Sequence, residues 1–171
     1  MEPMDILELI KTRRSIRKFQ KTSVEKEKID KCLEAARWAP SASNKQPWEF
    51  LLVSNEGKRK ELAKLAKFGK FVGEAPLVFV PLTNPEIHET YHASDTAMAT
   101  LQFMLAAHAQ GLATGWSAVY GKEFAKDIKN VLNIPEHLNV LALIAVGYSA
   151  LDKDPISLRK PIDKLVHYEK Y

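Results

Sequence analysis

The stretch Arg13-Arg14-Ser15-Ile16-Arg17-Lys18-Phe19 gathers four basic side chains and a hydroxyl just after a short amphipathic run. The apolar residues of that run, at positions 6, 7, 9 and 10, predict a first helix that ends near Thr12. Guanidinium groups this close together can hold a phosphate monoester through charge-assisted hydrogen bonds. A short basic run is also typical of a solvated helix end, so the cluster alone does not decide between the two interpretations.

A second polar stretch, Pro40-Ser41-Ala42-Ser43-Asn44-Lys45-Gln46-Pro47-Trp48, follows about one helix later. That helix is predicted by apolar residues at positions 29, 32, 33 and 36, by a capping box at 22–25, and by Pro40, which ends it. Serine, asparagine and glutamine between two prolines indicate a loop with defined turns. Their hydroxyl and amide groups suit a polar heterocycle or a sugar alcohol, although a capped turn would use the same residues.

Beyond Trp48 the chain alternates extended and helical patterns without a linker or an internal repeat, which predicts one domain over residues 1–171. The apolar runs at 76–82 and 140–147 indicate strands, the first of them covered on both faces. Residues 84–110 predict a long helix, with or without a break, whose second half is apolar all round, as in a buried helix or a subunit interface. We also expect a buried strand at 48–53, a short strand at 114–119, and helices at 58–67 and 121–132.

The composition allows a sizeable core, with 46% hydrophobic residues and a net charge of +4 from 25 Lys+Arg against 21 Asp+Glu. The single cysteine, Cys32, excludes an intramolecular disulfide and favours a reducing cytoplasm, and its apolar spacing predicts a core position. The N-terminal residues show no basic leader followed by an apolar run, and no apolar window is long enough to span a membrane. We therefore expect neither a signal peptide nor a membrane partner.

Four separated motifs together resemble the FMN-dependent nitroreductase family. They are Arg-Arg-Ser-Ile-Arg at 13–17, Ala-Pro-Ser-Ala-Ser-Asn-Lys-Gln-Pro-Trp at 39–48, Gly-Leu-Ala-Thr-Gly-Trp at 111–116, and Val-Gly-Tyr at 146–148 followed by Arg-Lys-Pro at 159–161. The resemblance runs from Ile6 to about Val166, with the motifs in the family's order. It is specific because all four motifs must coincide.

The resemblance implies an α+β fold, a three-layer α-β-α sandwich with a central, mainly antiparallel sheet. It also implies an intertwined homodimer with FMN in each interface. The helix around residues 98–105 would form the main dimer contact, and the C-terminal tail of about 150–171 would wrap the partner subunit.

The same resemblance assigns cofactor-binding residues. The ribityl phosphate and the pyrimidine edge of the flavin would be held by Arg13, Arg14, Ser15 and Arg17, with Arg159 joining at the phosphate. The loop that reaches the flavin from the other subunit corresponds to Pro40, Ser41, Ala42, Ser43, Asn44 and Gln46. Tyr120 and Gly121 match the turn whose backbone faces the reactive flavin nitrogen.

On this resemblance the chain would be an NAD(P)H-dependent oxidoreductase that passes a hydride from NADH or NADPH to FMN. Two electrons would then go to a nitroaromatic, quinone or enone acceptor in a ping-pong mechanism. Proximity and a dry stacking surface suffice for such a transfer, so we assign no catalytic acid or base.

The chain departs from the family pattern in two places. The segment 68–91 lacks the long helical insertion that roofs the flavin in larger relatives, which leaves the substrate pocket undefined. Phe68, Phe71 and Tyr91 are candidates to line that pocket, although aromatic residues near a helix break more often belong to the core. Ser157 stands where some relatives carry a second basic phosphate ligand, with Lys160 nearby.

A rival motif, His88-Glu89-Thr90-Tyr91-His92, satisfies H-E-x-x-H. On a helix its two histidines could bind zinc with Glu89 as general base, as in a metallopeptidase. Asp95 and Met98 stand where the extended form of the motif requires glycine and histidine. A polar start to the long helix is the simpler interpretation.

The net positive charge also permits a nucleic-acid binder. No interleaving of basic and aromatic residues and no docking motif accompanies that charge, and no G-x-G-x-x-G follows a predicted strand. We therefore expect no nucleic-acid partner.

Overall fold

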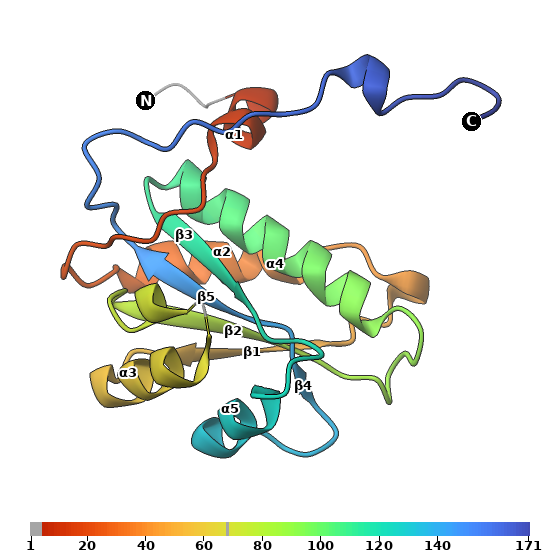
Figure 1. The fold of residues 1–171 in the computed structure, drawn as a ribbon. Helices are drawn as coiled ribbons and strands as arrows, with labels where there is room; N and C mark the ends of the chain where they lie inside the picture. Colours follow the sequence, from red (N-terminus) through yellow and green to blue (C-terminus); the bar gives the residue numbers. More distant parts are fainter. Residues whose placement is uncertain (1–4, 68) are drawn as a thin grey trace.

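The computed structural model describes residues 5–67 and 69–171, and an antiparallel sheet forms its centre (Figure 1). The main strands lie in the order β1 (Trp48–Val53), β2 (Leu77–Thr83), β5 (Ala142–Gly147) and β3 (Ala113–Ala118), and the short β4 (Asn139–Val140) pairs with β2. Because β2 and β5 occupy the middle of the sheet, they are buried along their whole length. At the edge, β1 is fully buried only at its two ends, so the expectation of a buried strand is wrong there.

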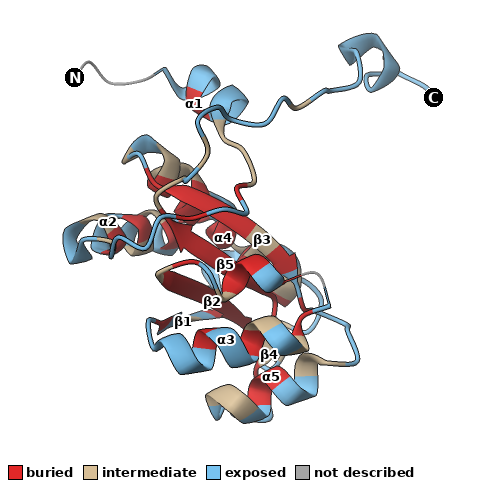
Figure 2. Ribbon diagram, turned by 60° about the vertical axis from the view of Figure 1, so that its left-hand side comes forward, coloured by how far each residue is buried: buried red, intermediate tan, exposed pale blue. Residues whose placement is uncertain are grey.

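Helices cover both faces of the sheet (Figures 1 and 2). On one face lie α2 (Lys26–Arg37) and α4 (His92–Ala109), and on the other lie α3 (Glu56–Leu65) and α5 (Ala125–Leu132). Neighbouring residues of β2 point to opposite faces, so Phe79 packs against α4 and Val80 packs with the α3 and α5 side. The rings of Phe79 and Phe103 stack with centroids 3.9 Å apart. The expected three-layer sandwich is confirmed.

The lone cysteine belongs to the core between α2 and α4. Cys32 is fully buried, and burial raises the pKa of its thiol to about 11. A thiol with so high a pKa stays protonated and packs as a small apolar group.

Most predicted elements form, but several of their boundaries differ. The helix expected at 58–67 is Glu56–Leu65, and the helix expected at 121–132 begins only at Ala125. The capping box at 22–25 is wrong: α2 begins after Glu25, whose side chain makes no capping bond. The long helix begins at His92 rather than near Asn84, because Asn84 Oδ1 accepts the Glu86 N–H at 2.9 Å and residues 84–91 form turns. The strand at 140–147 is interrupted at Leu141, whose carbonyl accepts the backbone N–H groups of Val119 and Tyr120.

Two segments project from the sandwich (Figures 1 and 2). Helix α1 (Ile6–Thr12), as predicted, precedes the basic cluster, and the tail after about residue 150 runs past it to the C-terminus. Short 3₁₀ turns occupy η1 (Ala42–Asn44), η2 (Lys70–Val72) and, in the tail, η3 (Ile162–Lys164). Apolar tail residues are strongly exposed, with Ile156 at 91% and Leu158 at 88%.

Candidate functional site

The basic cluster lies against the edge strand β3. Ser15 forms a parallel bridge with Thr114, and the Ile16 N–H donates to the Thr114 carbonyl at 2.9 Å. A side chain at Gly115 would clash with the Ile16 carbonyl and would place its Cβ 2.8 Å from the Phe71 ring. Gly115 therefore permits the close approach of the 13–17 segment to the sheet.

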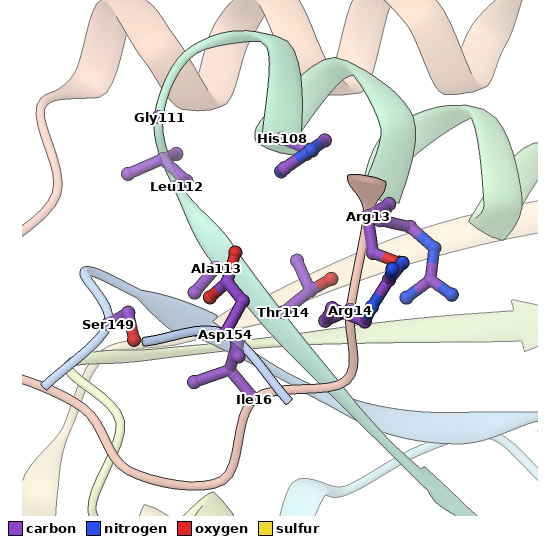
Figure 3. Close-up of a pocket in the computed structure, with 10 residues that line it drawn as sticks. All are labelled: Arg13, Arg14, Ile16, His108, Gly111, Leu112, Ala113, Thr114, Ser149 and Asp154. Atoms are coloured by element: carbon purple, nitrogen blue, oxygen red, sulfur yellow. The ribbon is translucent and has the colours of Figure 1, made fainter. Parts of the chain in front are cut away.

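One end of the cluster opens on a hollow of about 280 Å³, here called the arginine cavity (Figure 3). Its lining residues are Arg13, Arg14, Ile16, His108, Gly111, Leu112, Ala113, Thr114, Ser149 and Asp154. Figure 3 shows Arg13 and Arg14 together on one side of the cavity, with Ser149 across from them. The side chains come from the end of α1, the end of α4, β3 and the start of the tail.

Two buried polar atoms of this cavity have no hydrogen-bond partner among the residues that the structure describes. They are Arg13 Nη1 and Thr114 Oγ1. Burial lowers the pKa of Arg13, and the positive charges of Arg14 and Arg159 lower it further. Because an unpaired buried guanidinium group is costly, the geometry favours an anion that accepts hydrogen bonds here.

Arg14 and Arg159 connect the cluster with the tail. Arg14 Nε donates to the Pro155 carbonyl at 2.9 Å, and its Nη1 donates to the Lys11 carbonyl at 2.5 Å. Arg159 is exposed and donates to Ser157 Oγ and to the Leu158 carbonyl, yet its charge acts on Arg13. The structure thus brings together the three arginines that the sequence assigned to a phosphate.

Sequence reasoning missed His108 and Thr114. His108 Nε2 lies 2.9 Å from Thr12 Oγ1 and so joins α1 to the end of α4. The pKa of His108 lies below its ordinary value. Burial is the largest cause, the Asp154 carboxylate opposes it, and the charges of Arg13 and Arg14 lower the pKa further. A histidine in the apolar half of the predicted long helix was the available signal for this residue, whereas Thr114 gave none.

The other end of the cluster opens on a larger hollow of about 640 Å³, here called the Gly121 cavity. Arg17 lines it and lies with its guanidinium carbon 5.8 Å from the centre of the Phe71 ring. Trp116 and Gly121 line it as well, and Gly121 has a φ of 70°, a conformation that glycine adopts without strain. Arg17 and Gly121, assigned from separate motifs, therefore share one cavity. Tyr91 is half exposed and lies outside its lining, and Phe68 is outside the described residues.

The loop of residues 40–46 lies elsewhere, at the opposite end of α4 from the arginine cavity (Figure 1). The N-H of Ala42 donates to Asp95 on the first turn of α4 at 3.0 Å, whereas His108 stands near the end of that helix. At about 1.5 Å of rise per residue, the two positions are about 20 Å apart along α4. None of the loop residues lines either cavity.

The H-E-x-x-H sequence does not form a metal site. His88 precedes α4, and both ring nitrogens of His92 have partners, Nδ1 with Thr83 Oγ1 at 2.9 Å and Nε2 with Tyr120 Oη at 3.5 Å. Within residues 5–67 and 69–171, no group of three or more His, Cys, Asp or Glu side chains is placed to hold a metal ion. The zinc-peptidase alternative is not supported.

Among the helices that the structure describes, none is both long enough and apolar enough to cross a bilayer.

Comparisons with known proteins agree with this geometry. A family model described as "Nitroreductase family" matches residues 10–69 and 65–148. A protein of Methanothermobacter thermautotrophicus, provisionally named NADH dehydrogenase/NAD(P)H nitroreductase, is 36% identical over 98% of this chain and 88% of its own length. The solved structure of an FMN-dependent nitroreductase from Clostridium difficile R20291 superposes with a TM-score of 0.90 at 32% identity, covering 97% of this chain and 100% of the other. The solved structure of an NADPH:FMN oxidoreductase from Vibrio harveyi complexed with NAD+ gives a TM-score of 0.85 at 25% identity, covering 96% of this chain and 77% of the other.

Proposed function

The chain belongs to the nitroreductase family, and we propose that it is an oxidoreductase that uses FMN to carry electrons from NADH or NADPH to a small oxidised acceptor. The names of its relatives support both the cofactor and the reductant: one solved structure is an FMN-dependent nitroreductase, and another is an NADPH:FMN oxidoreductase. The acceptor we propose is a nitroaromatic, a quinone or an enone.

The observation that carries the proposal is the pair of unpaired polar atoms in the arginine cavity. A phosphate monoester is an anion with three acceptor oxygens, so it can accept from both Arg13 Nη1 and Thr114 Oγ1. Burial lowers the pKa of Arg13 most, and Arg14 and Arg159 lower it further by adding positive charge at the same place, where a phosphate would supply the opposite charge. These residues fit the phosphate of FMN.

The Gly121 cavity fits the ring end of the same molecule. Phe71 and Trp116 give it apolar walls, and Arg17 supplies a hydrogen-bond donor at its edge. When bound, FMN supplies the acceptance and donation of hydride. The protein's part is to hold the ring, present an apolar surface and exclude water, and we assign no side chain as acid or base.

A single cavity of this kind supports a ping-pong mechanism. The cavity of about 640 Å³ serves the nicotinamide and the acceptor in turn, so the first must leave before the second enters.

We further propose that the protein is a homodimer of one-domain subunits. The loop of residues 41–46 is about 20 Å along α4 from the arginine cavity of its own chain, which leaves it available to a second copy. Met98 and Leu101 are partly exposed on α4, and apolar residues of α1 and the tail are exposed as well: Ile6, Leu7, Ile10, Ile156, Leu158, Ile162 and Leu165. Apolar exposure on this scale marks an interaction surface. The use of a single cysteine, Cys32, supports a cytoplasmic location.

The test of this function is the visible spectrum of the purified protein. We expect a flavin band that NADH or NADPH bleaches under anaerobic conditions and that a nitroaromatic or a quinone restores. Initial rates at several fixed acceptor concentrations should give parallel double-reciprocal lines. A protein that remains colourless after incubation with FMN would refute the proposal.

A further inference from the structure

The first turn of α4 carries two buried polar side chains whose role lies outside the helix. His92 is 7% exposed and Asp95 is 3% exposed. Three residues apart on a helix, they face the same side. Buried polar groups are costly unless they are hydrogen-bonded, so their partners indicate what they do.

Asp95 holds the polar loop. Its Oδ2 accepts the Ala42 N–H at 3.0 Å, and Thr96, the next residue, donates its hydroxyl to the Pro47 carbonyl at 3.3 Å. The loop between those contacts has positive φ at Ser43, Asn44 and Gln46, at 52°, 54° and 49°. Left-handed backbone is strained for residues such as serine and glutamine, so the loop needs support from its surroundings.

His92 holds a different segment. Its Nδ1 pairs with Thr83 Oγ1 at 2.9 Å, which fixes the ring, and its Nε2 lies 3.5 Å from Tyr120 Oη. The two rings meet edge to face with centroids 5.9 Å apart. Tyr120 precedes Gly121, which lines the Gly121 cavity, and the Tyr120 N–H is bonded to the Leu141 carbonyl at 3.1 Å. The turn is therefore held at two points. Leu141, just before β5, binds the Tyr120 backbone, and His92 on α4 contacts the Tyr120 side chain.

We propose that the first turn of α4 is a positioning element for both cofactor-binding segments, with Asp95 holding the Ser41–Gln46 loop and His92 holding the Tyr120–Gly121 turn. This inference rests on the proposed function, because the two segments are binding segments only if FMN binds. It assigns the H-E-x-x-H residue His92 to positioning instead of metal binding. One rigid helical turn fixes the relative placement of a loop and a turn that are far apart in the sequence.

The test compares Asp95→Ala, Asp95→Asn and His92→Phe with Ser94→Ala as the matched control. Ser94 is exposed on the same turn, and its hydroxyl bonds only within the helix, to the Tyr91 carbonyl. The first measurement is the FMN dissociation constant by quenching of flavin fluorescence. The second is the visible circular dichroism of the flavin at saturating FMN, which reports the surroundings of the ring. The third is hydrogen exchange at the Ala42 amide in the protein without FMN.

We expect Asp95→Ala to weaken FMN binding about tenfold, or about 1.4 kcal/mol, and to speed exchange at Ala42. Asp95→Asn keeps an acceptor oxygen, so its affinity should stay within about threefold of the native value. His92→Phe should change the dichroism of the bound flavin while leaving the affinity within about threefold, because it disturbs the ring end and not the phosphate end. Ser94→Ala should match the native protein in all three measurements.

Native dichroism in His92→Phe, or native exchange at Ala42 in Asp95→Ala, would overturn the assignment of that residue. If the native protein does not bind FMN, the proposed function fails on its own. Slow exchange at Ala42 in the native protein and fast exchange in Asp95→Ala would still show that Asp95 holds the loop.

Discussion

Arg13 combines a half-buried position, an unpaired Nη1 and two neighbouring arginine charges. We expect Arg13→Ala to weaken FMN binding about ten- to hundredfold, because a charge-assisted hydrogen bond contributes about 1.5–3 kcal/mol and each tenfold is about 1.4 kcal/mol. Lys18→Ala removes the same charge from an exposed side chain that lines neither cavity, and its affinity should change by less than about threefold. Titration of flavin fluorescence measures the FMN affinity of both variants. Equal affinity of Arg13→Ala and the native protein would contradict the phosphate role.

His92 should make stability depend on pH. Burial lowers its pKa, and the charge of His88 lowers it further, so the folded protein keeps the ring neutral where the unfolded chain takes up a proton near the ordinary value of 6.5. The contribution of the neutral His92 ring to the free energy of unfolding is therefore complete above about pH 6.5. It is lost as the pH falls from there toward the lowered pKa of the folded protein.

Urea unfolding at about pH 8 and about pH 5.5 tests this for the native protein and His92→Gln, which cannot titrate at that position. The native protein should lose more of its free energy of unfolding than the variant over this range. Since His108 titrates in both proteins, the difference between them isolates His92. Identical losses would show that the ring makes no such contribution.

The arginine cluster at 13–17 drew attention because guanidinium groups suit a phosphate, whereas Gly121 was assigned only through the family resemblance. Thr114 was not predicted, because a threonine in a strand is ordinary until the fold sets it beside Arg13. His92 was recognised as part of a motif, but the metal chemistry considered for it depended on a helical His88. In the structure His88 precedes the helix, and Thr83 and Tyr120 occupy both ring nitrogens of His92.

The close contact between β3 and the basic segment can be tested through Gly115. In Gly115→Ala the added Cβ would push the Ile16 carbonyl and the Phe71 ring away, and Arg13 and Arg17 would move with that segment. We expect FMN binding to weaken by at least about tenfold while the protein still folds. The same substitution at Gly57 on α3 meets only Asn55 Oδ1 at 3.2 Å, so Gly57→Ala should bind FMN normally. Native affinity in Gly115→Ala would show that the segment is free to shift without loss of the site.

Hydrophobic periodicity located most helices and strands, because burial on one face fixes that pattern. It did not locate their ends. The Thr22 to Glu25 pattern matched a capping box, but Glu25 itself became the residue before the helix. Residues 84–91 are compatible with a helix by composition, yet Asn84 Oδ1 bonds the Glu86 N–H and stabilises turns there. The edge position of β1 depends on the order of strands in the sheet, which the sequence of one strand does not contain.

The exposed apolar side chains of the tail predict the state of association. Ile156 and Leu158 are almost fully exposed in a single chain, so replacing both by aspartate should leave a monomer unaffected. In the proposed homodimer the tail is covered by the partner. We then expect Ile156→Asp/Leu158→Asp to halve the mass measured by sedimentation equilibrium and to weaken FMN binding, whereas the exposed Lys153→Asp should do neither. A native mass for the double variant would place these residues outside any interface.

The assignment of the Ser41–Gln46 loop to a second copy can be tested by complementation in mixed dimers. One subunit carries Arg13→Ala and the other Asp95→Ala, with different affinity tags, and dimers that hold both tags are purified after co-expression. If each loop serves the partner's site, the Arg13→Ala subunit's site carries both defects and the other site carries none. Half of the sites should then bind FMN with native affinity. If each loop serves its own chain, every site carries one defect and none should bind normally, so a fluorescence titration that finds no tight sites would contradict the exchange of loops. The distance of about 20 Å along α4 between the loop and the arginine cavity favours the first outcome.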